Sequence, residues 1–304
     1  MINFKIIFLI GAFLFSFALV DTAYAQLGIG QPATIRGIDV TIEELDKVHV
    51  VHEVVKSSSP NSVQLIEGTI SNIEVVDEEG NEVQHGVSGG FGGNTVTLFP
   101  RSQDVFVKYD VSDVMFSKHG TTWTWHFLYL ATTTFHLPDS VDLAFVNDRP
   151  VYFTNERTFN CHGCEMVLEF IPNEKKTIEK VTWEGQEFDV QIWASTELSS
   201  FNFDQPTKSI SYDFDDTERW VTLIIPLELL WNPYQAWMGD EKIFTHEFKV
   251  DDEHYGVSLK LAEAGNVSIV GTSVIPEFPM IVPIMLVAIT MVILLQSRSR
   301  FSLR

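Results

Sequence analysis

The stretch TTWTWHFLYLA, residues 121–131, is the part of the sequence that decides the fold. Four aromatic side chains stand at every second position and therefore share one face of a β-strand: Trp123, Trp125, Phe127 and Tyr129. Four aromatics on one face bury a large area, which predicts the central strand of a β-sheet. The opposite face becomes apolar at Leu128 and Leu130, which predicts a strand covered on both sides. The alternative interpretation of the aromatic face is a sugar-binding platform.

The same alternation recurs along the chain in short runs rich in β-branched residues. These runs lie at 48–55, 70–76, 95–99, 105–111, 141–146, 190–194, 210–214, 221–225, 244–250, 255–261 and 267–270. Turn-forming residues separate them and no amphipathic helix intervenes, which predicts an all-β chain of antiparallel β-sandwiches. Charge rises and the apolar pattern stops at 172–177, so we expect two Ig-like domains. The distal domain is expected at 26–172 and the membrane-proximal domain at 178–271.

The N-terminus has the pattern of a signal peptide, predicted to span residues 1–25. Lys5 precedes an apolar run at 6–20, and Ala23 and Ala25 supply the small residues that a signal peptidase needs. We therefore expect the mature chain to begin at Gln26 and the middle of the chain to be exported. The alternative is a membrane helix that is not cleaved.

The C-terminus has the pattern of a membrane anchor. Residues 278–295 are a run of 18 without charge, which at about 1.5 Å per residue makes about 27 Å of helix, close to one hydrocarbon core. We expect a linker and sorting motif at 272–279, a transmembrane helix at 280–297 and a cytoplasmic tail at 298–304. The positive-inside rule assigns Arg298, Arg300 and Arg304 to the cytoplasm. The protein is therefore predicted in the cell membrane with its ectodomain outside.

The tetrapeptide Pro276-Glu277-Phe278-Pro279, the apolar helix after it and the terminal arginines together resemble the PEF-CTERM tails of archaeal surface proteins. Such tails are regarded as substrates of archaeosortases. The resemblance therefore implies an archaeosortase as partner, processing at the motif and re-anchoring of the protein. Residues 209–214, 225–230 and 267–272 resemble the membrane-proximal β-domain that precedes such tails in archaeal, particularly thaumarchaeal, proteins. One residue departs from the pattern, because Pro279 stands where comparable tails carry glycine.

The predicted ectodomain is strongly acidic. Without its two ends the chain has 16 basic and 39 acidic residues, a formal net charge of −23. Such a surface repels phosphate backbones and anionic lipid headgroups, which argues against nucleic-acid binding. It attracts small cations, although a high negative charge also simply keeps an exposed protein soluble.

The two cysteines of the chain lie together as Cys161-His162-Gly163-Cys164. Outside the cell this spacing favours a disulfide that closes a tight turn between two strands. A second interpretation is a metal site completed by other histidines, because thiolates and imidazoles bind zinc and copper. The sequence has no second CxxC or HxxxH half-site. A third interpretation is a redox-active pair in which His162 activates a thiol.

Other candidate sites are weaker. Acidic clusters at 77–79, 213–216 and 251–253 are candidate calcium sites, with solvated turns as the alternative. Asn266 begins an Asn-Val-Ser glycosylation sequon.

The sequence contains few features typical of an enzyme. The sequence has no H-E-x-x-H motif, and the Gly-rich segment at 86–93 is interpreted as a flexible hairpin tip. We therefore expect no enzyme and no cofactor, with copper, zinc or calcium as the ions of the candidate sites. The expected role is a structural or binding component of the cell envelope among other envelope proteins. The alternative is an extracellular metal-handling or redox module centred on Cys161 and Cys164.

Overall fold

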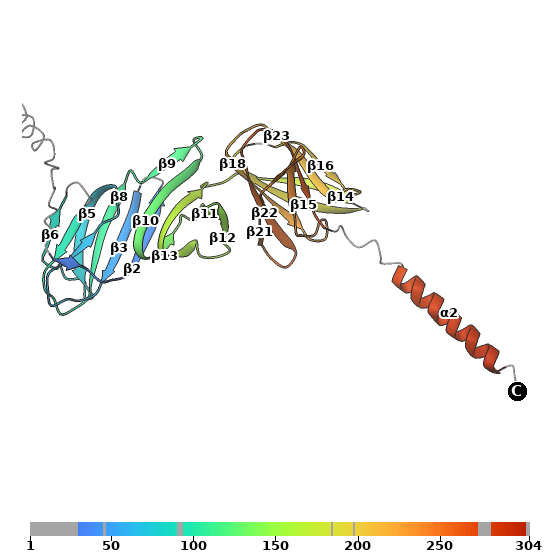
Figure 1. Cartoon of the computed structure of the whole chain (residues 1–304), viewed down its shortest axis with the longest axis horizontal. Coiled ribbons are helices and arrows are strands. Elements are labelled where there is room, and N and C mark those ends of the chain that lie inside the picture. The colour runs from blue at the N-terminus through green and yellow to red at the C-terminus, as the bar shows by residue number, and fades with distance from the viewer. Residues whose placement is uncertain are drawn as a thin grey trace, which may run out of the picture. The chain divides into compact units, whose positions relative to one another are not determined.

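The computed structural model describes residues 30–44, 47–89, 94–183, 185–196, 198–272 and 281–301. Across these residues the elements are β-strands, with one helix, α2, near the C-terminus (Figure 1). The predicted all-β fold class is therefore confirmed. The predicted signal peptide with Ala23 and Ala25 lies outside the described residues, as do the motif at 276–279 and Arg304.

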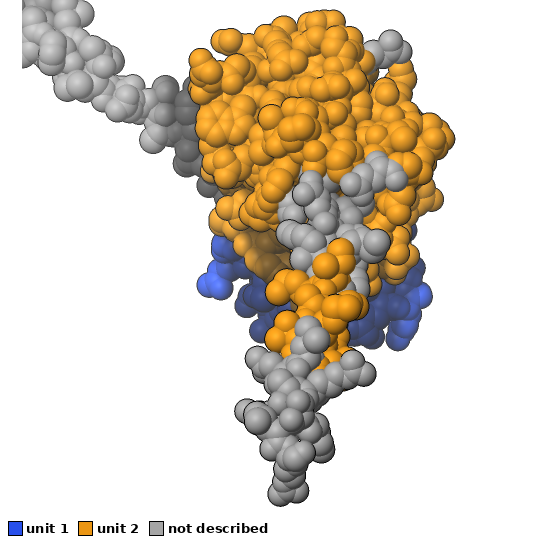
Figure 2. Space-filling model, turned by 90° about the vertical axis from the view of Figure 1, so that its right-hand side faces the viewer, with its two compact units in different colours: residues 1–35, 53–66, 74–107 blue, residues 36–52, 67–73, 108–304 orange. Residues whose placement is uncertain are grey.

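The chain divides into two compact units (Figure 2). The first comprises residues 1–35, 53–66 and 74–107, and the second comprises residues 36–52, 67–73 and 108–304. The first unit contains a four-stranded sheet in the order β1 (Gln31–Pro32), β4 (Asn61–Gln64), β7 (Thr95–Leu98) and β6 (His85–Ser88). Its buried side chains include Val63, Val96 and Leu98, each 0% exposed.

A nine-stranded sheet includes the strand with the aromatic face. Its order is β12 (Arg149–Tyr152), β11 (Leu143–Val146), β13 (Thr158–Phe170), β10 (Thr122–His136), β2 (Ile35–Glu44), β3 (Lys47–Val54), β8 (Val105–Ser112) and β5 (Thr69–Asp77), and β9 (Met115–Lys118) also pairs with β10. Strands β10 and β2 run parallel, from Thr133 opposite Ile38 to His136 opposite Thr41, and β1 and β4 are also parallel. The prediction of purely antiparallel sheets is therefore wrong. Strands joined by a long connection are free to pair in the same direction, whereas hairpins are not.

Strand β10 is confirmed as an interior strand, between β13 and β2. Trp125 and Phe127 are 2% and 1% exposed, and their rings meet edge to face with centroids 5.4 Å apart. Buried rings offer no stacking face to a sugar, so the interpretation as a binding platform is wrong for these two side chains. The opposite face is covered only at one end: Thr122 and Thr124 are 6% and 0% exposed, whereas Leu128 and Leu130 are 67% and 89% exposed. Single apolar side chains are common on protein surfaces, so an apolar position does not establish burial.

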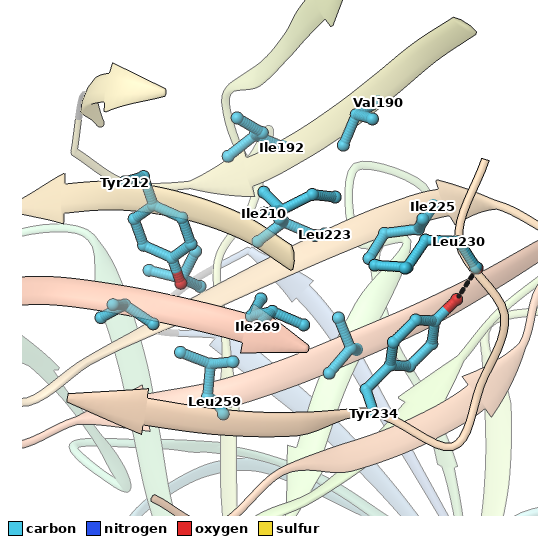
Figure 3. Close-up of a cluster of buried hydrophobic side chains, with 14 of the residues drawn as sticks. Val190, Ile192, Ile210, Tyr212, Leu223, Ile225, Leu230, Tyr234, Leu259 and Ile269 are labelled. Atoms are coloured by element: carbon cyan, nitrogen blue, oxygen red, sulfur yellow. Dashed lines mark hydrogen bonds between the residues drawn. The ribbon is translucent and has the colours of Figure 1, made fainter. Parts of the chain in front are cut away.

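The last ten strands form two antiparallel sheets of five. One has the order β14 (Lys176–Trp183), β15 (Gln186–Ala194), β18 (Arg219–Pro226), β22 (His254–Leu261) and β21 (His246–Lys249); the other has the order β16 (Ser199–Asp204), β17 (Ser209–Phe214), β23 (Gly265–Val270), β19 (Gln235–Met238) and β20 (Glu241–Ile243). Their buried side chains form one cluster, in which Ile192 and Leu223 of the first sheet lie with Tyr212 of the second (Figure 3). The Tyr234 hydroxyl donates to the Leu230 carbonyl at 2.9 Å. Two sheets with a common core make a β-sandwich.

Helix α2 (Ile281–Phe301) is present where a helix was predicted at 280–297, and its last two turns include Arg298 and Arg300. Its large apolar side chains at 284–294 are exposed, from Ile284 at 61% to Leu294 at 64%. Over the described residues, no helix combines the length and the apolar character needed to cross a membrane.

Candidate functional site

The Cys161-His162-Gly163-Cys164 segment lies inside strand β13, so the predicted tight turn between two strands is wrong. Gly163 has a φ of +60°, and a Cβ built there would lie 2.7 Å from the carbonyl oxygen of Leu130 on β10. Glycine is therefore the residue that fits, and the chain forms a β-bulge where a turn was expected. The register pairs on either side of the irregularity are Cys161 with Thr133, His162 with Thr132 and Cys164 with Tyr129.

The alternation of β13 shifts by one position across Gly163. On the C-terminal side Met166 is buried, and on the N-terminal side Phe159 stacks on Phe135 of β10 with ring centroids 5.1 Å apart. A regular strand directs residues three apart to opposite faces. The bulge instead puts positions 161 and 164 opposite two β10 residues that share one face.

Cys161 and His162 do not converge on one site. Neighbouring strand positions point to opposite faces, so exposed His162 is directed away from the face of Cys161. Its Nδ1 lies 3.4 Å from the Thr132 hydroxyl instead. Among the residues described, no group of three His, Cys, Asp or Glu side chains is arranged to hold a metal ion.

The acidic clusters at 77–79 and 251–253 cap their own turns, whereas Asp213 of the third cluster bonds to Asn266 on the neighbouring strand. Asp77 accepts hydrogen bonds from the backbone amides of Asn81 at 2.8 Å and Glu79 at 3.0 Å, and the amide of Asn81 is the largest cause of its lowered pKa. Asp251 likewise accepts hydrogen bonds from the backbone amides of Glu253 and His254. Asn266, the sequon residue, is exposed and donates from Nδ2 to Asp213 at 2.8 Å. These carboxylates therefore have structural partners of the kind that turns supply.

One serine motif was missed at the level of sequence. Residues 86–90 read Gly-Val-Ser-Gly-Gly, which matches G-x-S-x-G. That motif activates a serine at a sharp turn from a strand into a helix. Here Ser88 ends β6, which pairs with β7 in an antiparallel hairpin, Ser88 opposite Thr95. Ser88 therefore lies in a hairpin strand and not at the strand-to-helix turn that the motif requires.

A buried charged cluster of the second unit was also missed. Glu169 on β13 is 3% exposed, and its carboxylate accepts hydrogen bonds from Lys118 Nζ at 2.8 Å, Lys260 Nζ at 2.9 Å and Trp220 Nε1 at 3.0 Å. Burial by itself raises the pKa of Glu169, but these three donors together lower it to about 2. Glu169 is therefore ionised, and two lysines share its charge. We call these four side chains the Glu169 cluster.

Trp220 connects the Glu169 cluster to an apolar cluster. It stacks on Phe145 with ring centroids 3.7 Å apart and an interplanar angle of 7°. Trp193 and Ile224 are buried in the same group. Lys260 Nζ lies 5.2 Å from the Trp220 ring centroid, within the range of a cation–π contact. The indole is thus held by contacts on its ring and by its N–H.

A cleft of about 540 Å³ lies beside Trp220 and Lys260 in the second unit. Its apolar wall includes Met238, Ile243 and Phe244, and the Phe244 side chain is 77% exposed. The ring of Phe244 meets that of His246 edge to face at 4.6 Å. The volume is in the range of sites for small ligands.

The cleft also has a charged wall. Lys260 pairs with Asp148 at 3.0 Å as well as with Glu169. Glu241, Lys242 and Glu263 are exposed. Burial is the largest cause that lowers the pKa of His246, so the imidazole in the cleft is neutral near pH 7. The site therefore combines apolar rings with an excess of carboxylates.

Comparisons with known proteins add little. No family model matches the chain, and no curated protein has a similar sequence. The crystal structure of an aminopeptidase N family protein from Idiomarina loihiensis is similar at a TM-score of 0.34 and 12% identity, over 51% of this chain and 32% of that one. The chain thus spans about a third of the length of that structure. A likeness this low carries no argument about fold or activity.

Proposed function

We propose that the protein is exported, held in the cell membrane by its C-terminal helix, and acts outside the cell as a structural or binding component of the envelope. In this proposal residues 26–172 and 178–271 are two Ig-like domains, and the tail belongs to the PEF-CTERM type. The observation that carries the proposal is the uncharged run at 278–295. Its first residues lie outside the described part of the chain, over which no membrane-spanning helix is found, and the apolar side chains of α2 at 284–294 are exposed. A helix that is apolar on all sides needs a protein interior or a lipid bilayer around it.

Two further features support the same role. The acidic, all-β ectodomain with short turns is typical of exposed proteins that must stay soluble. The cleft beside Trp220 gives the chain a place to bind a ligand.

The test is membrane fractionation of the full chain after a carbonate wash, with protease added to intact cells. We expect the wild-type chain to stay with the membrane and its ectodomain to be cleaved from outside. A variant with Leu286→Arg and Ile289→Arg carries two charges in the middle of the apolar run, each costing about 3 kcal/mol in a bilayer, and is expected to be released. The matched control, Ser297→Arg with Ser299→Arg, adds the same charge beyond the run and should remain bound.

A wild-type chain that washes off the membrane, or an ectodomain that protease reaches only after lysis, would overturn the proposal. The mass of the C-terminal peptide then tests whether the tail is processed at the motif. A peptide that still contains residues 276–279 joined to α2 excludes processing by an archaeosortase, whereas a chain ending near the motif supports it.

We also propose a disulfide between Cys161 and Cys164 as a local clip in β13. The bulge at Gly163 supports it, because positions 161 and 164 then share a face. The second candidate function, a metal-handling or redox module, rests on the same pair. A denatured mass lighter by two hydrogens with no metal in the native spectrum supports the clip, whereas one bound copper or zinc with two free thiols supports the module.

A further inference from the structure

We infer that the cleft beside Trp220 binds a cationic group, a guanidinium or ammonium, carried on an apolar stem such as the side chain of a basic peptide. This inference deepens the binding role proposed above and rests on it. It depends on three properties of the cleft: its size, its free carboxylates and its exposed aromatic ring.

The size limits the ligand to a side chain or a small molecule. A volume of about 540 Å³ accommodates one flat or elongated group with its stem, not a folded domain. Met238 and Ile243 provide apolar surface for the stem.

The charges of the cleft determine the sign of the ligand. Lys260 is already paired with Asp148 and Glu169, so its ammonium is not available to an anion. The carboxylates of Glu241 and Glu263 have no hydrogen bond or ion pair within the described part of the chain. They outnumber the remaining cation, Lys242. A cation therefore finds uncompensated carboxylates, and an ectodomain net charge of −23 raises its local concentration.

The exposed ring supplies the second contact. Phe244 is 77% exposed at the cleft, and neutral His246 lies against it at 4.6 Å. A guanidinium stacks on such a ring by a cation–π contact, which contributes about 0.5–1 kcal/mol at an exposed site. The face of Trp220 is not available in the same way, because that side chain is only 3% exposed.

The test measures binding of the peptide acetyl-Gly-Arg-Gly-amide to the purified full chain in a mild detergent, by saturation-transfer NMR and calorimetry. We expect binding that weakens from about 0.05 to about 0.5 M NaCl, because exposed charges are screened. The same peptide with citrulline, which has the shape of arginine without its charge, is expected not to bind.

Variants assign the site. Glu241→Gln with Glu263→Gln is expected to weaken binding about tenfold, and Phe244→Ala separately is expected to weaken it about two- to fivefold. The matched control is Glu165→Gln, an exposed carboxylate on β13 that does not line the cleft. Absence of binding, equal binding of the citrulline peptide, or equal affinity in the variants and the control would overturn the inference. None of these results bears on membrane attachment, so the binding inference and the anchoring proposal fail separately.

Discussion

Replacing Glu169 by glutamine is expected to lower the free energy of unfolding by about 3 kcal/mol near pH 7. The change removes the one negative charge that Lys118 and Lys260 share, and it leaves an amide that cannot accept from all three donors. Breaking a buried ion pair typically costs about 3–5 kcal/mol. The lower end applies here, because the side chains of Lys118 and Lys260 are 35% and 29% exposed and water still solvates them.

The pH dependence gives an independent estimate for the same carboxylate. Its pKa is about 2 in the folded chain against an ordinary value of 4.5. Because the folded pKa is the lower one, the stabilisation is complete above pH 4.5 and is lost as the pH falls toward 2. At about 1.4 kcal/mol per pH unit, the difference corresponds to about 3.5 kcal/mol, which lies within the range of about 3–5 kcal/mol typical of a buried ion pair.

The assay is urea unfolding of the full chain in a mild detergent, near pH 7 and at several values down to about pH 3. Glu169→Gln should be less stable near neutral pH and lose less stability on acidification. Glu165→Gln, an exposed control four residues away on β13, should stay within about 0.5 kcal/mol of wild type. If Glu169→Gln matches this control and keeps the acid sensitivity of wild type, the explanation by a buried charge is refuted.

Three further predictions concern single side chains. Burial lowers the pKa of His52 from 6.5 to about 3. The unfolded chain therefore binds the proton at a higher pH than the folded chain, and the free energy of unfolding falls as the pH drops below 6.5. His52→Gln should reduce this loss, measured by urea unfolding at pH 7 and pH 5. Gly163→Ala should cost about 2 kcal/mol in thermal unfolding, more than Gly120→Ala, which also has positive φ but open space around it. Tyr212→Phe should leave the melting temperature unchanged or higher, because its buried hydroxyl has no partner among the described residues, whereas Tyr234→Phe should lower it.

The alternation of apolar residues predicted many of the strands, because it reports burial within a few neighbouring residues. Each run predicted by period two contains a strand or lies largely within one, β10 and β18 among them. The same rule failed at Leu130, since burial depends on what lies over a face and the sequence of one strand does not contain that information. Strand β13 was missed because Gly163 was interpreted as part of a turn, although a glycine inside a strand also signals a bulge.

The Glu169 cluster lay beyond local sequence reasoning. Glu169 stands 51 residues from Lys118 and from Trp220 and 91 from Lys260. In the pattern of β13 it alternates with buried Leu168 and Phe170, which predicts an outward, solvated carboxylate. Only packing from distant parts of the chain covers it. The cleft was missed for the same reason, because its lining comes from residues 148 to 263.

The cleft and the Glu169 cluster are coupled through Lys260, which pairs with Asp148 at the cleft and with Glu169 below it. In Glu169→Gln the Lys260 ammonium loses its buried partner, and the cleft gains positive charge. A cationic ligand should then bind more weakly than to wild type, measured near pH 7 where the variant remains folded. Linkage requires the reverse as well: the arginine peptide should stabilise wild type more than the variant. Equal peptide affinity in both proteins would show that Lys260 does not transmit charge between the two sites, and the cation would then be recognised by Glu241, Glu263 and Phe244 alone.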